Sequence, residues 1–468
     1  MGVMIYRWEQ LGTVKLSQAL ALRGHHLVSK HSVLVGASLE IDFDTEQGRR
    51  RTMKAVEEEV RRHIRLLRTV SCVSWLLGAF LLYLSSLLPL FDSSPRVLLD
   101  NTEYSFPTSA LLRWDVFHFG HIALEGYVYE YEWAFLPGTP FVMNAISQLF
   151  KFVGLSNSTH FWSQVVVAGA LAACGTGTAT TLYDLTLVLT KSTHFALLSS
   201  LLSLLPSSPV TLRYVPYTEP FFTYLSYRGM LFCARSQWFL AACSFSLASA
   251  FRSNGIMLGG FIIWGLLLEP AFRLQKVALT QVLKATILTA VIFAPFIYHQ
   301  YAAYTSFCFA DTPRPWCSQR LPLIYSYVQK QYWNSGGFLS YWTLSQLPNF
   351  LLSAPVLVLL LWSSSLHIRT VFLSPIFKIP KPSCFTKTGP LTPSLTPHAI
   401  HTIIFTSILL FASHTQIVLR LAASMPFTYW SAAYLVVIYP QWGRRWVTWS
   451  IVWGAVSIVL WSVFLPPA

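Results

Sequence analysis

The chain has 468 residues, of which 54% are hydrophobic and only 11% are charged. An average soluble domain is about 25% charged, so a chain this apolar could not cover its surface with polar groups in water. The composition excludes a soluble globular protein, a disordered chain and a small disulfide scaffold. It predicts an integral membrane protein that crosses the bilayer several times.

The net charge of +14 is unevenly distributed, because residues 1–68 hold 20 of the 52 charged residues. Nucleic-acid binding needs a basic patch on a solvated face. Here the basic residues form short runs beside apolar segments, which is typical of cytoplasmic loops. We therefore expect no nucleic-acid partner, and we interpret residues 1–68 as a basic, cytosolic N-terminal extension.

The first predicted span follows directly on a basic helix. Residues 49–68 contain eight Lys and Arg side chains, and residues 70–90 then continue without a charge. About twenty apolar residues cross a hydrocarbon core of about 30 Å. The basic flank predicts a cytosolic N-terminus and a chain that emerges in a lumen. Because residues 1–45 show no signal-peptide pattern, the segment is interpreted as an uncleaved signal anchor.

Residues 91–160 form the longest stretch without a convincing span and are predicted to be luminal, with a glycosylation sequon at Asn157. Segments 211–228 and 428–440 fit either a span or a half-buried helix. Residues 378–397 are predicted to be a cytosolic loop. In total we expect about eight to twelve spans in an all-α polytopic fold. The clearer spans after the first lie at about 161–189, 194–210, 236–269 (long enough for a hairpin), 278–300, 343–363, 399–423 and 446–466.

Two of the seven cysteines are distinctive. Cys308 and Cys317 bracket a Pro-rich loop that follows the span ending near Tyr301. A luminal loop permits a disulfide, so we predict that these two cysteines pair. No further Cys/His pair has the spacing of zinc ligands, so the sequence predicts no metal site, with Asp115, His118 and His121 as the weaker alternative for one.

The segment Arg113 to His121 reads Arg-Trp-Asp-Val-Phe-His-Phe-Gly-His. Asp115, His118 and His121 are spaced i, i+3, i+6, and we expect them to share one face of a helix. A carboxylate beside aromatic groups at a membrane surface is a candidate general base. The alternative is a solvated luminal loop with interfacial aromatic side chains, and the spacing alone does not decide between the two.

Charged side chains within apolar segments are costly to bury and usually have a partner or a function. Arg252 and Asn254 lie in Phe-Arg-Ser-Asn-Gly, Glu219 precedes Pro220, and Arg420 ends His-Thr-Gln-Ile-Val-Leu-Arg. An arginine can bind two phosphate oxygens at once, so a phosphate-bearing ligand suits either arginine. The alternative is an interfacial cation that reaches toward lipid headgroups.

Further blocks follow the 113–130 segment in order along the chain. Together these blocks resemble the PIG-V family of mannosyltransferases over about residues 69–466, and residues 1–60 fall outside the resemblance. The further blocks are Phe-Leu-Pro-Gly at 135–138, Ser-Pro to Glu-Pro at 208–220, Phe-Arg-Ser-Asn-Gly at 251–255, Pro-Trp-Cys to Gln at 315–329, Tyr-Trp-Asn to Phe at 332–338, Tyr-Trp to Ala-Pro at 341–355, and Gln to Trp at 416–430.

The resemblance implies a GT-C glycosyltransferase of the endoplasmic reticulum, built as a transmembrane helix bundle over residues 69–466. Its luminal loop 91–160 would carry short amphipathic helices and the catalytic motif. Members take mannose from dolichyl-phosphate-mannose and add it, in α1,6 linkage, as the second mannose of the glycosylphosphatidylinositol (GPI) precursor. In fungi the family enzyme is similar to the catalytic half of a complex with a smaller membrane subunit.

The residues agree with the chemistry that the resemblance implies. A phosphate leaving group needs no general acid, so one carboxylate suffices, and inversion of a β-linked donor gives an α-linked product. Asp115 is the expected base, and Arg252 and Arg420 are expected on the phosphate side. No cofactor is required, and a divalent ion is left open. The other candidate substrate-binding residues are Arg113, Trp114, His118, His121, Glu125, Glu130, Glu219, Asn254, Trp333 and Asn334.

Three alternatives stay open at the level of sequence. The nearest is another dolichyl-phosphate-sugar transferase with a different acceptor, although the middle and C-terminal blocks favour PIG-V. A transporter would predict inverted repeats with paired broken helices, and none is evident. A non-catalytic scaffold would tolerate loss of Asp115.

Overall fold

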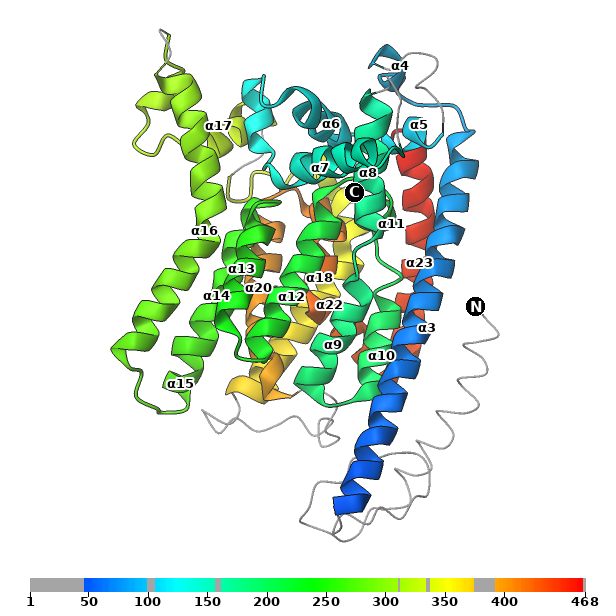
Figure 1. The fold of residues 1–468 in the computed structure, drawn as a ribbon, viewed down its shortest axis with the longest axis vertical. Helices are drawn as coiled ribbons and strands as arrows, with labels where there is room; N and C mark the ends of the chain where they lie inside the picture. Colours follow the sequence, from blue (N-terminus) through cyan, green and yellow to red (C-terminus); the bar gives the residue numbers. More distant parts are fainter. Residues whose placement is uncertain are drawn as a thin grey trace. The chain divides into compact units, whose positions relative to one another are not determined.

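The computed structural model describes residues 46–98, 106–155, 161–309, 312–333, 337–373 and 392–465. The chain divides into two compact units, Met1–Glu58 and Glu59–Ala468. The second unit holds every candidate site residue, and its described residues form helices and no strands (Figure 1). The all-α polytopic fold predicted from composition is thus confirmed.

The basic segment and the first apolar segment form one helix, α3 (Glu46–Ser86). Residues Glu59 onward of α3 belong to the second unit, where Arg213 donates from Nη2 to the Ser71 carbonyl (2.9 Å) and from Nη1 to Ser74 Oγ (2.9 Å). Gly78 makes room for the phenol of Tyr214, which occupies the place of a side chain there. The apolar half of α3 is therefore fixed to the bundle by polar contacts as well as by packing.

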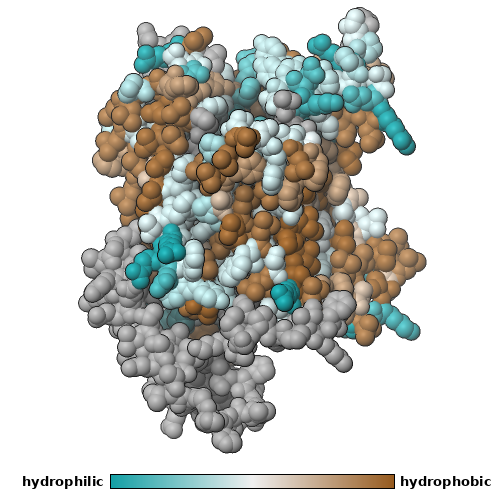
Figure 2. Space-filling view, turned by 180° about the vertical axis from the view of Figure 1, so that it is seen from behind, coloured by the Kyte–Doolittle hydropathy of each residue, from teal (hydrophilic) through white to brown (hydrophobic). Residues whose placement is uncertain are grey.

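Apolar helices make up the body of the second unit. Six helical segments of the described chain are long and apolar enough to cross a membrane, and a seventh is added if the pair Thr415–Ser424 and Pro426–Ile438, bent by 87°, is one span. Figure 2 shows hydrophobic side chains over much of the visible face, between hydrophilic side chains near its upper and lower rims. The principal helices are α8 (Phe161–Cys174), α9 (Thr178–Thr190), α10 (Thr193–Leu202), α12 (Thr218–Ala234), α13 (Trp238–Ser249), α16 (Leu279–Cys308), α18 (Leu347–His367), α20 (Thr396–Phe411), α22 (Pro426–Ile438) and α23 (Pro440–Ser462).

The predicted number of spans is higher than the number of long apolar helices because several predicted segments are broken or short. The predicted span 161–189 corresponds to one candidate span, Phe161–Thr190, although residues 175–177 separate α8 from α9 within it. Helices α10 and α13 have only 10 and 12 residues. A run of apolar residues indicates that a segment is buried in protein or lipid. It does not distinguish a helix that spans the membrane from a short helix inside the bundle.

The prediction of one span over 399–423 is wrong in its second half. Helix α20 ends at Phe411, and three short helices follow, η10 (Thr415–Ile417), α21 (Val418–Leu421) and η11 (Ala422–Ser424). A continuous helix through Arg420 would carry a guanidinium in an apolar environment, which is costly without a partner. The break instead places Arg420 on carboxylates of other segments.

A second break lies inside the predicted segment 236–269. Helix α13 ends at Ser249, and a 3-10 turn, η3 (Ser253–Leu258), precedes α14 (Gly259–Ile263). Gly255 lies so close to α13 that a Cβ atom would be 2.6 Å from the Cα of Ser249. This close approach folds the Phe-Arg-Ser-Asn-Gly block back on α13 and positions Arg252 at the break.

The predicted loop 91–160 contains short helices at one end of the bundle, together with α17 (Ile324–Gln331) (Figure 1). Helix α6 buries the side chains of Val116, Phe119 and Ile122. Residues 156–160, with the sequon at Asn157, lie outside the described residues. The short helices are α4 (Pro95–Leu98), α5 (Thr108–Leu111), α6 (Asp115–Glu125), η2 (Glu130–Ala134) and α7 (Gly138–Phe152).

The side of the membrane on which α6 lies is a prediction from the basic flank of α3, and a glycosylation tag tests it. A tag inserted near residue 105 should acquire an N-glycan, because the positive-inside rule places this segment in the lumen. The same tag at residue 40 should stay unmodified. Glycosylation at residue 40 with none near residue 105, measured by the endoglycosidase-sensitive mobility of the protein, would invert the topology.

Candidate functional site

A cavity of about 340 Å³ opens where α6 meets the ends of the bundle helices. Its wall combines charged, polar and aromatic side chains from segments that are distant in the sequence. Clefts of this kind, with a few convergent polar groups, are the usual form of a ligand site. The lining residues are Asp115, Phe119, Ala134, Phe135, Leu136, Thr218, Phe251, Arg252, Ser253, Tyr325, Gln329, Trp333, Ser413, His414, Ile417 and Arg420.

Asp115 is the first residue of α6 and faces this cavity. The preceding residue, Trp114, has φ 51°, a backbone conformation that costs a side-chain-bearing residue about 1–3 kcal/mol. The indole of Trp114 stacks on Phe464 at 5.1 Å between ring centroids, and the Asp115 N–H donates to Tyr217 Oη at 3.2 Å. These contacts hold the turn, while the helix N-terminus favours a negative charge at the Asp115 carboxylate.

One buried carboxylate holds both predicted arginines. The Glu219 side chain is 1% exposed, and its Oε1 lies 2.9 Å from Arg252 Nη1 and 2.7 Å from Arg420 Nη2. Arg420 Nε also donates to Glu219 Oε1 at 2.8 Å, so the contact between Arg420 and Glu219 uses two nitrogens. Arg420 Nη2 lies 3.7 Å from Asp115 Oδ2. Glu219 therefore sets the positions of two cations beside the cavity.

Further contacts orient each guanidinium. Arg252 donates from Nη1 to Thr218 Oγ1 (2.6 Å) and from Nε to Asn254 Oδ1 (3.2 Å). Arg420 lies over the ring of Tyr217, 4.7 Å from its centroid. Within the described part of the chain, neither Nη2 of Arg252 nor Nη1 of Arg420 contacts a hydrogen-bond acceptor, so both nitrogens stay available to a ligand.

The charges of this cluster suit an anionic leaving group. Two arginines oppose Glu219 and Asp115, so the four side chains are neutral together. Without Asp115, the two arginines and Glu219 carry one net positive charge next to the cavity. An anion could bind on the arginine side, and Asp115 would accept a proton on the other side. This arrangement can support a displacement in which a hydroxyl attacks and a phosphate departs.

His118 and His121 do not line the cavity that Asp115 faces. Steps of three and six residues leave them about 60° and 120° around the helix axis from Asp115. His121 Nδ1 lies 2.6 Å from Glu132 Oε1. His118 stacks on Phe135 at 4.7 Å, and burial lowers the pKa of its imidazole although the Asp115 and Glu132 carboxylates oppose this shift.

Glu132 is a structural residue that the sequence reading missed. Its Oε2 accepts hydrogen bonds from the backbone N–H groups of Val128 (3.0 Å) and Tyr129 (2.9 Å), while Oε1 contacts His121. A carboxylate that accepts several backbone hydrogen bonds fixes a turn. Glu132 thus holds the segment after α6 in place.

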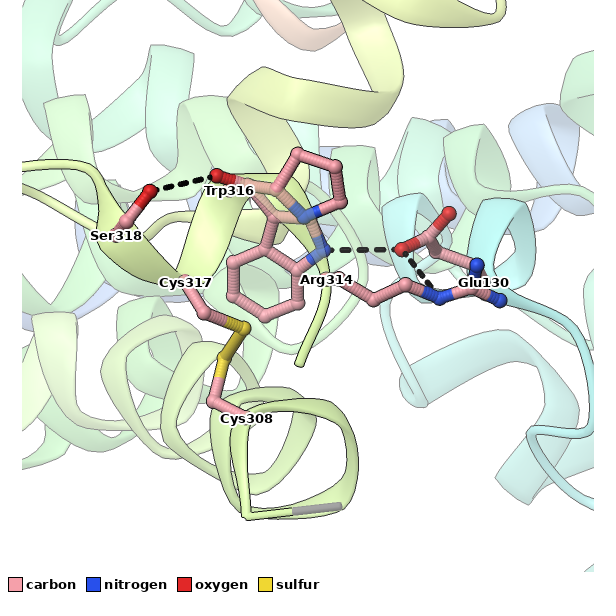
Figure 3. The surroundings of a disulfide bond; sticks show 7 residues. Glu130, Cys308, Arg314, Trp316, Cys317 and Ser318 are labelled. Atoms are coloured by element: carbon pink, nitrogen blue, oxygen red, sulfur yellow. Dashed lines mark hydrogen bonds and ion pairs between the residues drawn. A yellow bond between two sulfur atoms is a disulfide. The ribbon is translucent and has the colours of Figure 1, made fainter. Parts of the chain in front are cut away.

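Glu130 does not line the cavity but connects the 91–160 segment to the disulfide loop. Figure 3 shows the Trp316 indole pointing at the Glu130 carboxylate beside the Cys308–Cys317 disulfide. Trp316 Nε1 donates to Glu130 Oε1 at 2.9 Å, Arg314 Nε lies 3.6 Å from the same oxygen, and Tyr332 Oη donates to Oε2 at 3.0 Å. The structure thus forms the disulfide predicted from the sequence and gives it a place against Glu130.

Removing this disulfide should loosen the loop that carries Trp316. The double variant Cys308→Ser/Cys317→Ser should unfold at lower temperature, because a cross-link that closes a loop of this length stabilises a protein by roughly 2–3 kcal/mol. The thermal midpoint in detergent measures the effect, and Cys72→Ser serves as the control because Cys72 is an exposed free cysteine. Labelling of both Cys308 and Cys317 by a thiol reagent in unreduced membranes would contradict the pairing.

The remaining predicted residues divide into those at the cavity and those elsewhere. Trp333 lines the cavity, with its ring edge-on to Phe135 at 5.5 Å. Arg113 is buried and donates to the carbonyls of Leu112 (2.8 Å) and Ser462 (3.1 Å), so it fastens the turn before α6 to α23. Glu125 is exposed at the far end of α6, and Asn334 lies outside the described residues.

Several lining residues were not predicted as site residues. Tyr325 and Gln329 lie on α17, and Ser413 and His414 lie between α20 and η10. His414 stacks on Tyr341 at 4.7 Å, and burial lowers the pKa of its imidazole. In the sequence, each of these residues is only a polar or aromatic side chain near the end of an apolar segment. Such residues occur at the membrane interface of most membrane proteins, so they do not indicate a site.

Known proteins are similar to this chain over most of its length. The family described as Mannosyltransferase (PIG-V) matches residues 65–468. A GPI mannosyltransferase 2 of Cryptococcus neoformans var. neoformans serotype D is 36% identical over 434 residues, which cover 86% of this chain and 98% of that protein. GPI alpha-1,6-mannosyltransferase 2 of Cricetulus griseus is 31% identical and that of Homo sapiens 30%, each covering 70% of this chain and 73% of the relative. No solved structure matches.

Proposed function

Because this chain belongs to the PIG-V family of mannosyltransferases, we propose that it adds the second mannose, in α1,6 linkage, to the GPI precursor. The relatives named GPI mannosyltransferase 2 and GPI alpha-1,6-mannosyltransferase 2 support this role. The proposed donor is dolichyl-phosphate-mannose, and the proposed acceptor is the lipid-linked precursor with one mannose.

One observation supports the proposed roles of individual residues. Asp115 and the cluster of Arg252, Glu219 and Arg420 line or border the same cavity. A donor with a phosphodiester has one negative charge, which matches the net charge of the two arginines and Glu219. The available nitrogens, Arg252 Nη2 and Arg420 Nη1, would bind the phosphate oxygens. Such a site favours a lipid-phosphate sugar over a neutral donor.

Asp115 acts as the base in the proposed reaction. The acceptor hydroxyl oxygen forms a bond to the anomeric carbon as its proton moves to the Asp115 carboxylate. The bond between that carbon and the phosphate oxygen breaks on the opposite face, and the electron pair leaves with dolichyl phosphate. The configuration inverts from β to α. The arginines stabilise the charge that grows on the leaving oxygen.

The aromatic wall of the cavity supports a place for the sugar. Phe119, Phe135 and Trp333 lie beside Asp115 around the opening, and aromatic faces pack against the apolar C–H faces of a pyranose. Ser253, whose hydroxyl donates to Tyr325 Oη at 2.8 Å, adds polar atoms from the break between α13 and α14. These residues replace His121, Glu125 and Glu130 as the proposed contacts of the acceptor glycan.

The proposed location is the membrane of the endoplasmic reticulum, with α6 and the cavity on the luminal side. Helices long and apolar enough to cross the bilayer would keep the cavity in the same membrane as the lipid-linked donor. A smaller accessory membrane subunit is proposed as a partner, on the basis of the family resemblance alone. The reaction as proposed uses no cofactor, and none of its steps requires a divalent ion.

Lipid analysis of a depleted strain tests the acceptor. Loss of this protein should cause accumulation of a GPI precursor with one mannose, and re-expression should restore the later precursors. Accumulation of an unmannosylated precursor, or of a shortened N-glycan donor with normal GPI precursors, would assign the enzyme to another dolichyl-phosphate-sugar reaction. Unchanged lipids in both pools would contradict a transferase role.

A further inference from the structure

Three side chains that commonly bind metals meet on the side of the bundle away from α6. Glu59 and His63 lie one turn apart on α3, and His194 lies in the first turn of α10, next to the turn that joins α9 and α10 (Figure 1). Glu59 Oε1 is 3.8 Å from His63 Nε2 and 3.7 Å from His194 Nδ1. The three ligand atoms all lie within 4.8 Å of one another.

These distances fit a single tetrahedral ion. A zinc ion binds imidazole nitrogen and carboxylate oxygen at about 2.0–2.2 Å, so its ligand atoms lie roughly 3.4 Å apart. Glu59 and each histidine need to approach by only a few tenths of an ångström, and the two histidine nitrogens, which lie within 4.8 Å of each other, by at most about 1.4 Å. Residues four apart on a helix face the same direction, which is why Glu59 and His63 can both reach His194.

The surrounding hydrogen bonds match those that orient metal ligands. The Nδ1 atom of His63, the nitrogen that faces away from Glu59, lies 3.0 Å from the hydroxyl of the buried Tyr183. Thr193 Oγ1 donates to Glu59 Oε1 at 2.9 Å. A metal-binding imidazole usually has its second nitrogen held by a hydrogen bond, which fixes the tautomer and the ring orientation.

We propose that Glu59, His63 and His194 bind one divalent ion of the zinc class, separate from the mannosyl-transfer cavity. Imidazole and carboxylate together favour Zn²⁺ over Mg²⁺ or Ca²⁺, which prefer oxygen ligands alone. The Glu59 and His194 side chains are 32% and 68% exposed, so water can reach the fourth position. The ion would join α3 to the turn between α9 and α10.

An ordinary ion pair explains less of the geometry. One protonated histidine would suffice for Glu59, yet both imidazoles approach the same oxygen of that carboxylate. Two protonated imidazoles beside each other would repel, with ring centroids only 6.1 Å apart. A shared cation satisfies all three groups with both histidines neutral. Sequence reading predicted no metal site because His194 is far from Glu59 and His63 along the chain.

Zinc binding by the purified full chain tests the proposal. The protein carries a purification tag without histidine, is stripped with EDTA in detergent, and is titrated with Zn²⁺ against a chromophoric competitor. Wild type should bind one Zn²⁺ that is lost in Glu59→Gln and in His194→Ala, with affinity at this site falling about 100-fold or more. Glu58→Gln is the matched control, because it removes the same charge one residue away and should leave zinc binding unchanged.

A second readout protects the result from misfolding of a variant. Co²⁺ bound in a tetrahedral site of the wild type should give visible absorption bands that His194→Ala abolishes, and the exposed His194 side chain can be removed without opening the core. Equal Zn²⁺ affinity and equal Co²⁺ spectra in wild type and His194→Ala would overturn the proposal. So would the absence of saturable Zn²⁺ binding in the wild type.

Discussion

Replacing Arg252 with alanine should lower kcat/KM for mannose transfer from dolichyl-phosphate-mannose by about 10²- to 10³-fold, the usual effect of removing one donor that stabilises a developing charge. Arg252 is held by Thr218, Glu219 and Asn254 with one terminal nitrogen left for a ligand. The assay uses purified enzyme in detergent with a GPI precursor that contains one mannose, normalised to folded protein.

Arg252→Lys separates charge from geometry. Lysine keeps the positive charge but cannot contact Thr218, Asn254 and a phosphate with one planar group, so its activity should lie between that of wild type and alanine. Arg273→Ala is the control, because Arg273 forms an exposed ion pair with Glu269, four residues earlier in the chain. Wild-type turnover in both Arg252 variants would mean that Arg252 helps only to orient the chain in the membrane and takes no part in the reaction.

The division of the effect between kcat and KM carries further information. The donor phosphate has one negative charge in the ground state and gains a second as the bond to the sugar breaks. An arginine that interacts more strongly with the second charge stabilises the transition state more than the bound donor. The loss in Arg252→Ala should therefore appear mainly in kcat. A rise in KM alone would indicate that the arginine binds donor and transition state equally.

Glu219 explains how two arginines stay in an apolar bundle. A buried cation without a partner is costly, and removing one partner of a buried pair typically destabilises a protein by about 3–5 kcal/mol. Glu219 neutralises part of the charge of Arg252 and Arg420 and leaves the rest for a ligand. The carboxylate is thus a positioning residue, while the arginine nitrogens make the proposed contacts.

The sequence predicted which residues matter better than how they meet. Glu219, Arg252 and Arg420 were singled out because charges are rare within apolar segments. Their common carboxylate was not predictable, because Arg420 and Glu219 lie 201 residues apart and meet only after the chain breaks between α20 and α22. Composition and apolar length predicted an all-α membrane fold, and the 343–363 segment corresponds closely to α18. They could not reveal which apolar segments break.

The two predicted histidines lie outside the cavity for a local reason. Six residues do not make a whole number of helical turns, so His121 lies about 120° around α6 from Asp115. Glu132 then attracts His121 away from the cavity, an interaction that depends on how η2 folds back on α6. His414 escaped notice because a single histidine at the end of an apolar segment has no distinguishing pattern, although the fold brings it into the cavity wall.

Asp115→Asn should leave a folded but nearly inactive enzyme. Asparagine keeps the shape of the side chain and some hydrogen bonding, yet it cannot accept the proton of the acceptor hydroxyl. A positioned base contributes about 10²–10⁴-fold in rate, so turnover should fall by that factor. Asp115→Glu should also be severely impaired, because the turn at Trp114 and the Arg420 contact at 3.7 Å hold the carboxylate at one depth in the cavity.

The control for Asp115→Asn lies on the same helix. Glu125→Gln removes the same charge from the exposed far end of α6, away from the cavity lining, and should retain wild-type turnover. Because Asp115 also contacts Arg420, a thermal midpoint for each variant distinguishes lost chemistry from lost folding.

If folded Asp115→Asn keeps more than about a tenth of wild-type turnover, the proton must go to another acceptor, since a positioned base contributes at least about 10²-fold. Glu130 and Glu132 are both engaged outside the cavity, so among the described residues His414 would then be the lining side chain with a basic nitrogen to examine next.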